Sequence, residues 1–315
     1  MHLPLTERIL SRLPGPRWLW IGIWVLVPLA VILEGQRRDP SLLFPNTPFL
    51  VAFIYTVIAS FLGTRWLNRS LATIEPMVAD LLPAQTPEPF RPVDRIDGPL
   101  LLTAAMMLAF PVNIYLNDPR LSTAGSISMV GLLTVPLVTL GWTIGSIFLG
   151  LSRLGRIPLA FRPFETDRSL GLRPLGVLAF RTVLLYLVVF LPSTIMGSYT
   201  IYYAAVLSAL NLAVVFPFFG SLWGLRRQLL TAKARHVTWA RDRYARAFRA
   251  VRDAPSPAAV RELAPELEVA EAFERRAESI QEWPFDDRIL RTLAAVFSSI
   301  VTAVIVRLIL IQVGL

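Results

Sequence analysis

Residues 174–225 read PLGVLAFRTVLLYLVVFLPSTIMGSYTIYYAAVLSALNLAVVFPFFGSLWGL, and the only charged side chain among them is Arg181. As one helix this stretch would be about 78 Å long, more than twice the hydrocarbon thickness of a bilayer. It must therefore fold back once, and Pro192 and Gly197 offer the break. We predict two membrane-spanning helices within residues 175–223.

The composition of the whole chain points the same way. Of 315 residues, 54% are hydrophobic and 17% are charged, whereas soluble domains carry about 25% charged residues. Disordered, collagen-like and disulfide-rich classes are therefore excluded. The sequence contains no cysteine, which excludes disulfides, iron–sulfur clusters, cysteine zinc sites and thiol catalysis.

The uncharged stretches predict an all-α, polytopic integral membrane bundle of about seven membrane-spanning helices. The first and second spans fall within residues 18–66, the third and fourth within 99–152, the fifth and sixth within 175–223, and the last at 292–315.

The net charge of +9 follows the predicted topology. Most arginines lie in segments that share one side of the membrane if the N-terminus is cytoplasmic and the C-terminus is external. These cytoplasmic segments are residues 1–17, 67–98, 153–174 and 224–291. We therefore expect a multi-pass protein of the cell membrane, and we do not expect nucleic acid as a partner.

Two of the cytoplasmic segments are connectors. In residues 67–98, Leu71, Ile74, Val78 and Leu81 form an amphipathic pattern followed by a proline-rich string. We interpret them as a helix on the membrane surface and an extended strap, or, more simply, as a plain connector that lies on the membrane. Residues 153–174 are basic, and each arginine near an anionic lipid surface gains about 1 kcal/mol. Ordinary topological bias is the alternative explanation. The candidate ligands for anionic lipid headgroups are Arg153, Arg156, Arg162, Arg168 and Arg173.

The segment 224–291 predicts an antiparallel helical hairpin of the coiled-coil type. Apolar residues recur at steps of three and four in two seams, the first on a basic arm and the second on a mainly acidic arm. Between the arms, Ser256 is suited to cap the second helix and Pro257 to open it. No proline or glycine separates Leu225 from Ala254, so the first arm should continue the sixth span unbroken.

Several kinds of chemistry are excluded. Both histidines, His2 and His236, lie outside the spans, which rules out bis-histidine haem and a Ser–His hydrolase within the membrane. The only lysine, Lys233, is also outside the spans, so no span contains the lysine that a retinal protein needs to form its Schiff base. Carboxylates are missing from most spans, and proton coupling usually needs one there. We therefore expect no catalytic residue, no cofactor and no metal site.

The candidate functional residues are polar or helix-breaking groups within the spans. Arg181 and Arg307 are intramembrane charges, which suggest function, although both could extend to the nearest interface instead. Prolines free backbone carbonyls that can line an ion path, but they are also tolerated as kinks. These candidates are Pro111, Pro136 and Pro217, with Asn113 and Asn211 as polar neighbours. A small-residue pair, Gly141 and Gly145, predicts a close helix–helix contact.

Two functional hypotheses follow. The first is a passive transport protein, a homo-oligomeric channel or pore for an ion that the sequence does not identify. The second is a non-catalytic membrane scaffold or sensor whose cytoplasmic hairpin mediates assembly. The spans and the hairpin are common to both, so the sequence alone does not separate them. Membrane lipids with anionic headgroups are the expected partners in either case.

Overall fold

The computed structural model describes residues 4–38, 47–83, 88–106, 123–161, 169–197, 209, 211 and 213–313. Within these ranges the regular structure is helical and no strand occurs, so the all-α prediction is confirmed. The helices are α1 (Leu5–Arg12), α2 (Arg17–Arg38), α3 (Thr47–Leu81), the short 3₁₀ helix η1 (Arg91–Asp94), α5 (Thr123–Leu154), α6 (Arg173–Gly197), α8 (Val215–Arg252), α9 (Pro257–Glu278) and α10 (Asp287–Val313).

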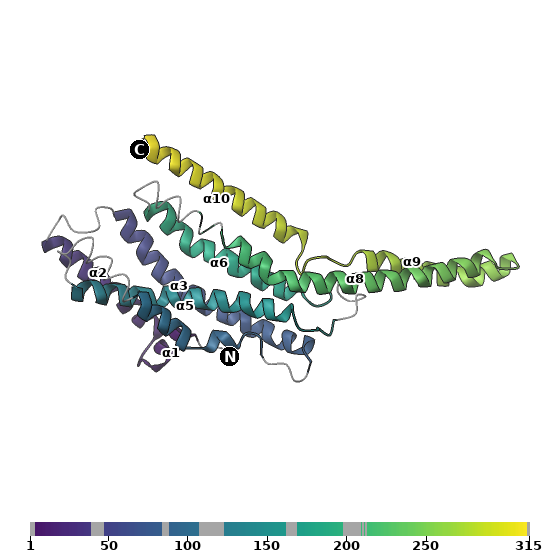
Figure 1. Cartoon of the computed structure of the whole chain (residues 1–315), viewed down its shortest axis with the longest axis horizontal. Helices are drawn as coiled ribbons and strands as arrows, with labels where there is room; N and C mark the ends of the chain where they lie inside the picture. Colours follow the sequence, from purple (N-terminus) through teal and green to yellow (C-terminus); the bar gives the residue numbers. More distant parts are fainter. Residues whose placement is uncertain are drawn as a thin grey trace.

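A helical bundle and a long arm make up the molecule (Figure 1). In the bundle, α3 packs against α5 and α6, and α5 packs against the first half of α8. Their contacts are dominated by leucines and other large apolar side chains that are fully buried, including Leu67, Leu71, Leu140, Ile147, Leu151, Leu178 and Phe218. The second half of α8 leaves the bundle with α9 folded back along it (Figure 1).

Two helical segments in the described part of the chain, Thr134–Leu154 and Arg173–Phe190, are long and apolar enough to cross a membrane. A shorter apolar segment, Arg17–Val27, opens α2. Both long segments coincide with predicted spans. Several of the other predicted spans fall partly on residues 107–122 and 198–208, which lie outside the described residues.

The structure corrects the interpretation of residues 71–81 as a separate helix on the membrane surface. They are the last three turns of α3, which runs unbroken from Thr47 to Leu81 with Pro76 inside it. Leu71 and Val78 are buried in the same apolar cluster as α5 and α6. The pattern correctly marked an apolar face, but that face packs against protein.

The hairpin follows the prediction closely. α8 is a continuous helix of 38 residues that belongs to the bundle at one end and to the arm at the other. At the turn, the backbone N–H of Ala259 donates to the Ser256 hydroxyl oxygen at 3.3 Å, which is an N-cap, and Pro257 is the first helical residue of α9. Pro265 lies inside α9 without ending it.

Small side chains and opposite charges hold the two arms together. Ala240, Ala247, Ala270 and Ala277 are buried along the seam, where their size lets the helices approach closely. On the flank, Arg241 of α8 contacts Glu274 at 3.4 Å and Glu278 at 2.9 Å. These ion pairs are exposed, so each contributes little to stability. They act mainly by selecting which faces of α8 and α9 pack together.

Candidate anion-binding pocket

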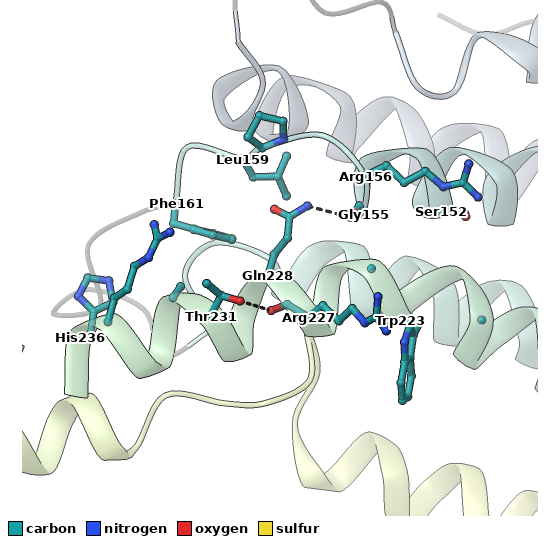
Figure 2. A pocket seen from close by; sticks show the side chains of 15 residues that line it. Ser152, Gly155, Arg156, Leu159, Phe161, Trp223, Arg227, Gln228, Thr231 and His236 are labelled. Carbon is teal, nitrogen blue, oxygen red and sulfur yellow. Dashed lines mark hydrogen bonds between the residues drawn. The ribbon is translucent and has the colours of Figure 1, made fainter. Parts of the chain in front are cut away.

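The loop that follows α5 is fixed on the side of α8 where the arm begins. The side-chain amide of Gln228 donates to the carbonyl of Gly155 at 2.9 Å and to the carbonyl of Ile157 at 2.8 Å (Figure 2). On its other side, the loop N–H of Ala160 donates to the carbonyl of Leu81 at 2.9 Å. Residues 155–161 are therefore held between α8 and the end of α3.

Two glycines bring the loop and α8 into backbone contact. A Cβ atom on Gly155 would lie 2.7 Å from the Cα of Gly224, and a Cβ on Gly224 would lie 2.7 Å from the Cα of Gly155. Real Cβ atoms do not approach other atoms so closely. Only glycine fits at both positions, and the close approach allows Gln228 to reach the loop carbonyls.

A pocket of about 860 Å³ lies between this loop and α8. Figure 2 shows Leu159 and Phe161 on the loop side and Thr231 on α8, whereas Arg156 extends towards Ser152 at one end of the pocket and His236 lies at the other end. Its described lining includes the following residues of α8: Trp223, Arg227, Gln228, Thr231, Arg235 and His236.

The pocket is strongly cationic. Arg156, Arg227 and Arg235 line it, and among its described lining residues none is acidic. None of the three guanidinium groups pairs with a carboxylate in the described part of the chain. His236 adds a titratable ring, and burial lowers its pKa from the ordinary 6.5. Arginine forks match the oxygens of phosphate and carboxylate groups, so the arrangement suits an anionic ligand.

An aromatic joint next to the pocket fixes the base of the arm. The guanidinium of Arg226 lies over two indole rings, 5.2 Å from the centroid of Trp223 and 4.8 Å from that of Trp283. Trp283 stacks on Phe285, with centroids 5.5 Å apart, and Phe285 stacks on the buried Phe218 of α8 at 5.8 Å. The segment after α9 is thereby packed against the bundle.

The predicted loop arginines separate into different roles. Arg156 lines the pocket, and Arg153 is exposed on the last turn of α5. Arg173 instead pairs with Asp286 at 2.7 Å and ties the start of α6 to the joint. Arg162 and Arg168 lie outside the described residues.

The predicted intramembrane residues are not gathered into one site within the described part of the chain. The exposed Arg181 lies 5.9 Å from the ring of Trp66, a cation–π contact that suits a side chain extending towards an interface. Pro136 and Asn211 are buried, and Pro217 is exposed on α8. Pro111 and Asn113 lie outside the described residues, as does the side chain of Arg307, whose backbone belongs to α10.

Sequence reasoning missed Arg227 and Arg235 as members of a site, because it assigned them to the basic arm of the hairpin. The usable signal was their spacing. Gly220, Gly224, Arg227, Thr231 and Arg235 follow one another at steps of three and four, which places them on one face of a helix. A helix face on which small residues are followed by arginines indicates a cavity that is positively charged at one end.

The fold and the pocket define an all-helical protein with at least two helices apolar enough for a membrane and a cationic cavity at the base of an arm. No family model matches the chain, and no curated protein or solved structure is significantly similar to it.

Proposed function

We propose that the chain is a multi-pass protein of the cell membrane, with about seven spans, a cytoplasmic N-terminus and an external C-terminus. The two long apolar helices of the bundle support this proposal, as do the arginines that begin where those helices end: Arg153 after α5 and Arg173 before α6. The α8–α9 arm then projects into the cytoplasm, and α10 returns alongside the bundle as the last span (Figure 1).

We propose that its function is that of a non-catalytic membrane scaffold or sensor whose arm mediates assembly. The observation that carries this is the continuity of α8. Phe218, Leu222 and Leu225 are fully buried in the bundle, and Ala240 on the same unbroken helix is fully buried in the arm. Because no hinge separates the two parts, a contact made by the arm is transmitted to the bundle as a rigid-body constraint.

The arm carries large apolar side chains that are exposed and so contribute little to the packing of α8 against α9. Phe248 is 47% exposed, Val260 37% and Val269 46%, all in or near the half of the arm that lies away from the bundle. Phe248 on α8 and Val260 on α9 lie about one turn from the tip on either side of it, and exposed apolar side chains that lie together favour association. The partner that fits best is a second copy of the chain, because the basic and acidic side chains that do not pair within the arm make it electrostatically self-complementary.

The absence of cysteine from the sequence provides a clean test. A single cysteine in place of the exposed Ala250 should give an oxidised dimer in native membranes. The pair Phe248→Ser and Val260→Ser should abolish that dimer, whereas the exposed control Ala245→Ser should not. A monomer under all conditions, or an unchanged dimer in the double variant, would contradict assembly through the arm.

An oligomeric channel or pore remains a second candidate, and one observation favours it. Thr56, Ser60, Thr64 and Asn68 form a buried polar ladder along one face of α3. The Ser60 hydroxyl donates to the Thr56 carbonyl at 2.6 Å, and the Thr64 hydroxyl donates to the Ser60 carbonyl at 2.8 Å. Purified protein in liposomes should then conduct ions, with flux altered by Asn68→Leu or Arg307→Ala. A silent bilayer containing folded protein would count against transport.

A further inference from the structure

A second cavity adjoins the cationic pocket. It has a volume of about 550 Å³ and lies between α5, α6 and α8, with Phe148, Tyr186, Phe190 and Pro217 in its lining. Ser152 lines both cavities, and Gly220 of the pocket is followed directly by Ser221 of the groove. The two cavities adjoin at Ser152, and we treat them as one path that is mostly apolar at one end and cationic at the other.

One face of α8 runs along the whole path. The α8 side of the path is lined, in chain order, by Ala213 just before the helix and then by Pro217, Gly220, Gly224, Arg227, Thr231 and Arg235. The spacing of three and four residues keeps them on one side of the helix. Apolar and small residues come first and cations follow, in the same order as on α5, where Arg153 ends the apolar part of the helix.

Glycines leave space along the path, Gly141 and Gly145 in the groove and Gly220 in the pocket. A Cβ atom on any of the three would have no described atom within 4 Å. Gly141 and Gly145 line the groove, so within the described part of the chain they do not make the close helix contact that their spacing predicted. The backbone approach occurs at Gly155 and Gly224 instead.

We infer that this path binds one anionic phospholipid, with its phosphate near Arg156 and Arg227, at the end of the pocket that Ser152 shares with the groove, and an acyl chain in the groove along α5 and α8. The three arginines have no carboxylate partner in the described residues, so the pocket attracts anions, and arginine suits phosphate oxygens. A soluble phosphate ester would use the pocket alone. The adjoining apolar groove, at the depth of the predicted spans, favours a ligand that carries hydrocarbon.

The lipid site does not depend on assembly through the arm, and it is tested on the full chain purified in a neutral detergent. Binding of dioleoyl phosphatidylglycerol is measured by native mass spectrometry against dioleoyl phosphatidylcholine. We expect preferential retention of phosphatidylglycerol. The double variant Arg156→Gln and Arg227→Gln should lose about fivefold in affinity per arginine removed.

A matched control is available on α8. Arg246 and Arg249 are exposed on the arm and bond to carbonyls of their own helix. The pair Arg246→Gln and Arg249→Gln removes the same charge outside the pocket and should leave phosphatidylglycerol binding unchanged. Equal losses in the two double variants, or equal retention of the two lipids by the unaltered chain, would overturn the assignment.

The apolar end is tested separately. Gly145→Leu should fill the groove and weaken phosphatidylglycerol binding, while glycerol 3-phosphate, which has no acyl chain, should bind more weakly than the lipid and be unaffected by the change. Gly141→Leu is a second filling variant, and circular dichroism confirms that each one is folded. If glycerol 3-phosphate binds as tightly as the lipid and both filling variants leave lipid binding unchanged, the ligand is a soluble phosphate ester and the lipid assignment is wrong.

Discussion

The guanidinium of Arg226 lies 4.8 Å from the ring centroid of Trp283, and this contact joins α8 to the segment that links α9 with α10. The buried Nε atom of Arg226 has no hydrogen-bond partner in the described part of the chain. Its charge is balanced by indole faces and by Glu282 at 3.9 Å. The guanidinium is thus flanked by two indole rings at the point where the arm leaves the bundle.

Trp283→Ala should destabilise the protein by about 3 kcal/mol, the lower part of the range for removing a large aromatic side chain. The change removes the contacts of Trp283 with Phe285 and Phe219 as well as with Arg226. Thermal unfolding followed by circular dichroism in detergent measures the loss. Trp239→Ala, at a tryptophan that is 43% exposed on the arm, is the control and should cost less. Equal losses of stability in the two variants would mean that Trp283 stabilises the protein no more than an exposed tryptophan on the arm does.

Gly224→Ala and Gly220→Ala should have opposite effects on stability, although the chemical change is the same. A Cβ on Gly224 would meet the backbone of Gly155, which Gln228 holds in place, so we expect a cost of about 1–3 kcal/mol. At Gly220 no described atom lies within 4 Å. Alanine there should stabilise the helix by up to about 1 kcal/mol. Unfolding temperatures that shift in the same direction would refute the close approach.

The hairpin could be predicted in detail because its determinants are local. The spacing of apolar residues gave the two seams, Ser256 and Pro257 gave the start of α9, and the lack of proline or glycine after Leu225 gave the continuity of α8. Each of these features acts within a few residues along the chain. Local physics of this kind can be worked out without knowing the tertiary fold.

Features that depend on distant parts of the chain could not be predicted in the same way. The apolar face at Leu71 and Val78 was recognised, but the spacing does not say whether lipid or protein covers it. The spacing rule selected Gly141 and Gly145, whereas the close approach joins Gly155 to a residue on another helix. The pocket likewise needs Arg156 and Arg235 from separate segments, and only the fold brings them together.

Ser256→Ala should weaken the tip of the arm by about 1 kcal/mol, because the N–H of Ala259 loses its only side-chain acceptor among the described residues. The effect should be local, so amide hydrogen exchange in the first turn of α9 should accelerate while exchange in α8 near Leu229 stays slow. Ser256→Thr keeps the acceptor and should restore protection. Ser279→Ala, at the other end of α9, should leave the first turn unchanged.

The last prediction concerns His236, whose pKa is lowered by burial from the ordinary value of 6.5. The fold therefore favours the neutral ring, so its contribution to stability is complete above about pH 6.5 and decreases as the pH falls towards the lowered pKa. An anionic headgroup that extends to the His236 end of the pocket would favour the charged ring instead. Lipid affinity should then rise as the pH falls through this range.

The ring can be observed directly. The sequence has two histidines, so His2→Gln leaves His236 as the single imidazole for nuclear magnetic resonance titration. Without lipid its resonance should titrate below the ordinary pKa, and with phosphatidylglycerol the midpoint should move upward. His236→Gln should keep lipid binding through the arginines but remove its dependence on pH. If the titration midpoint of His236 does not change when lipid is added, the anionic headgroup lies away from this ring, because an anion close to the imidazole must stabilise its protonated form.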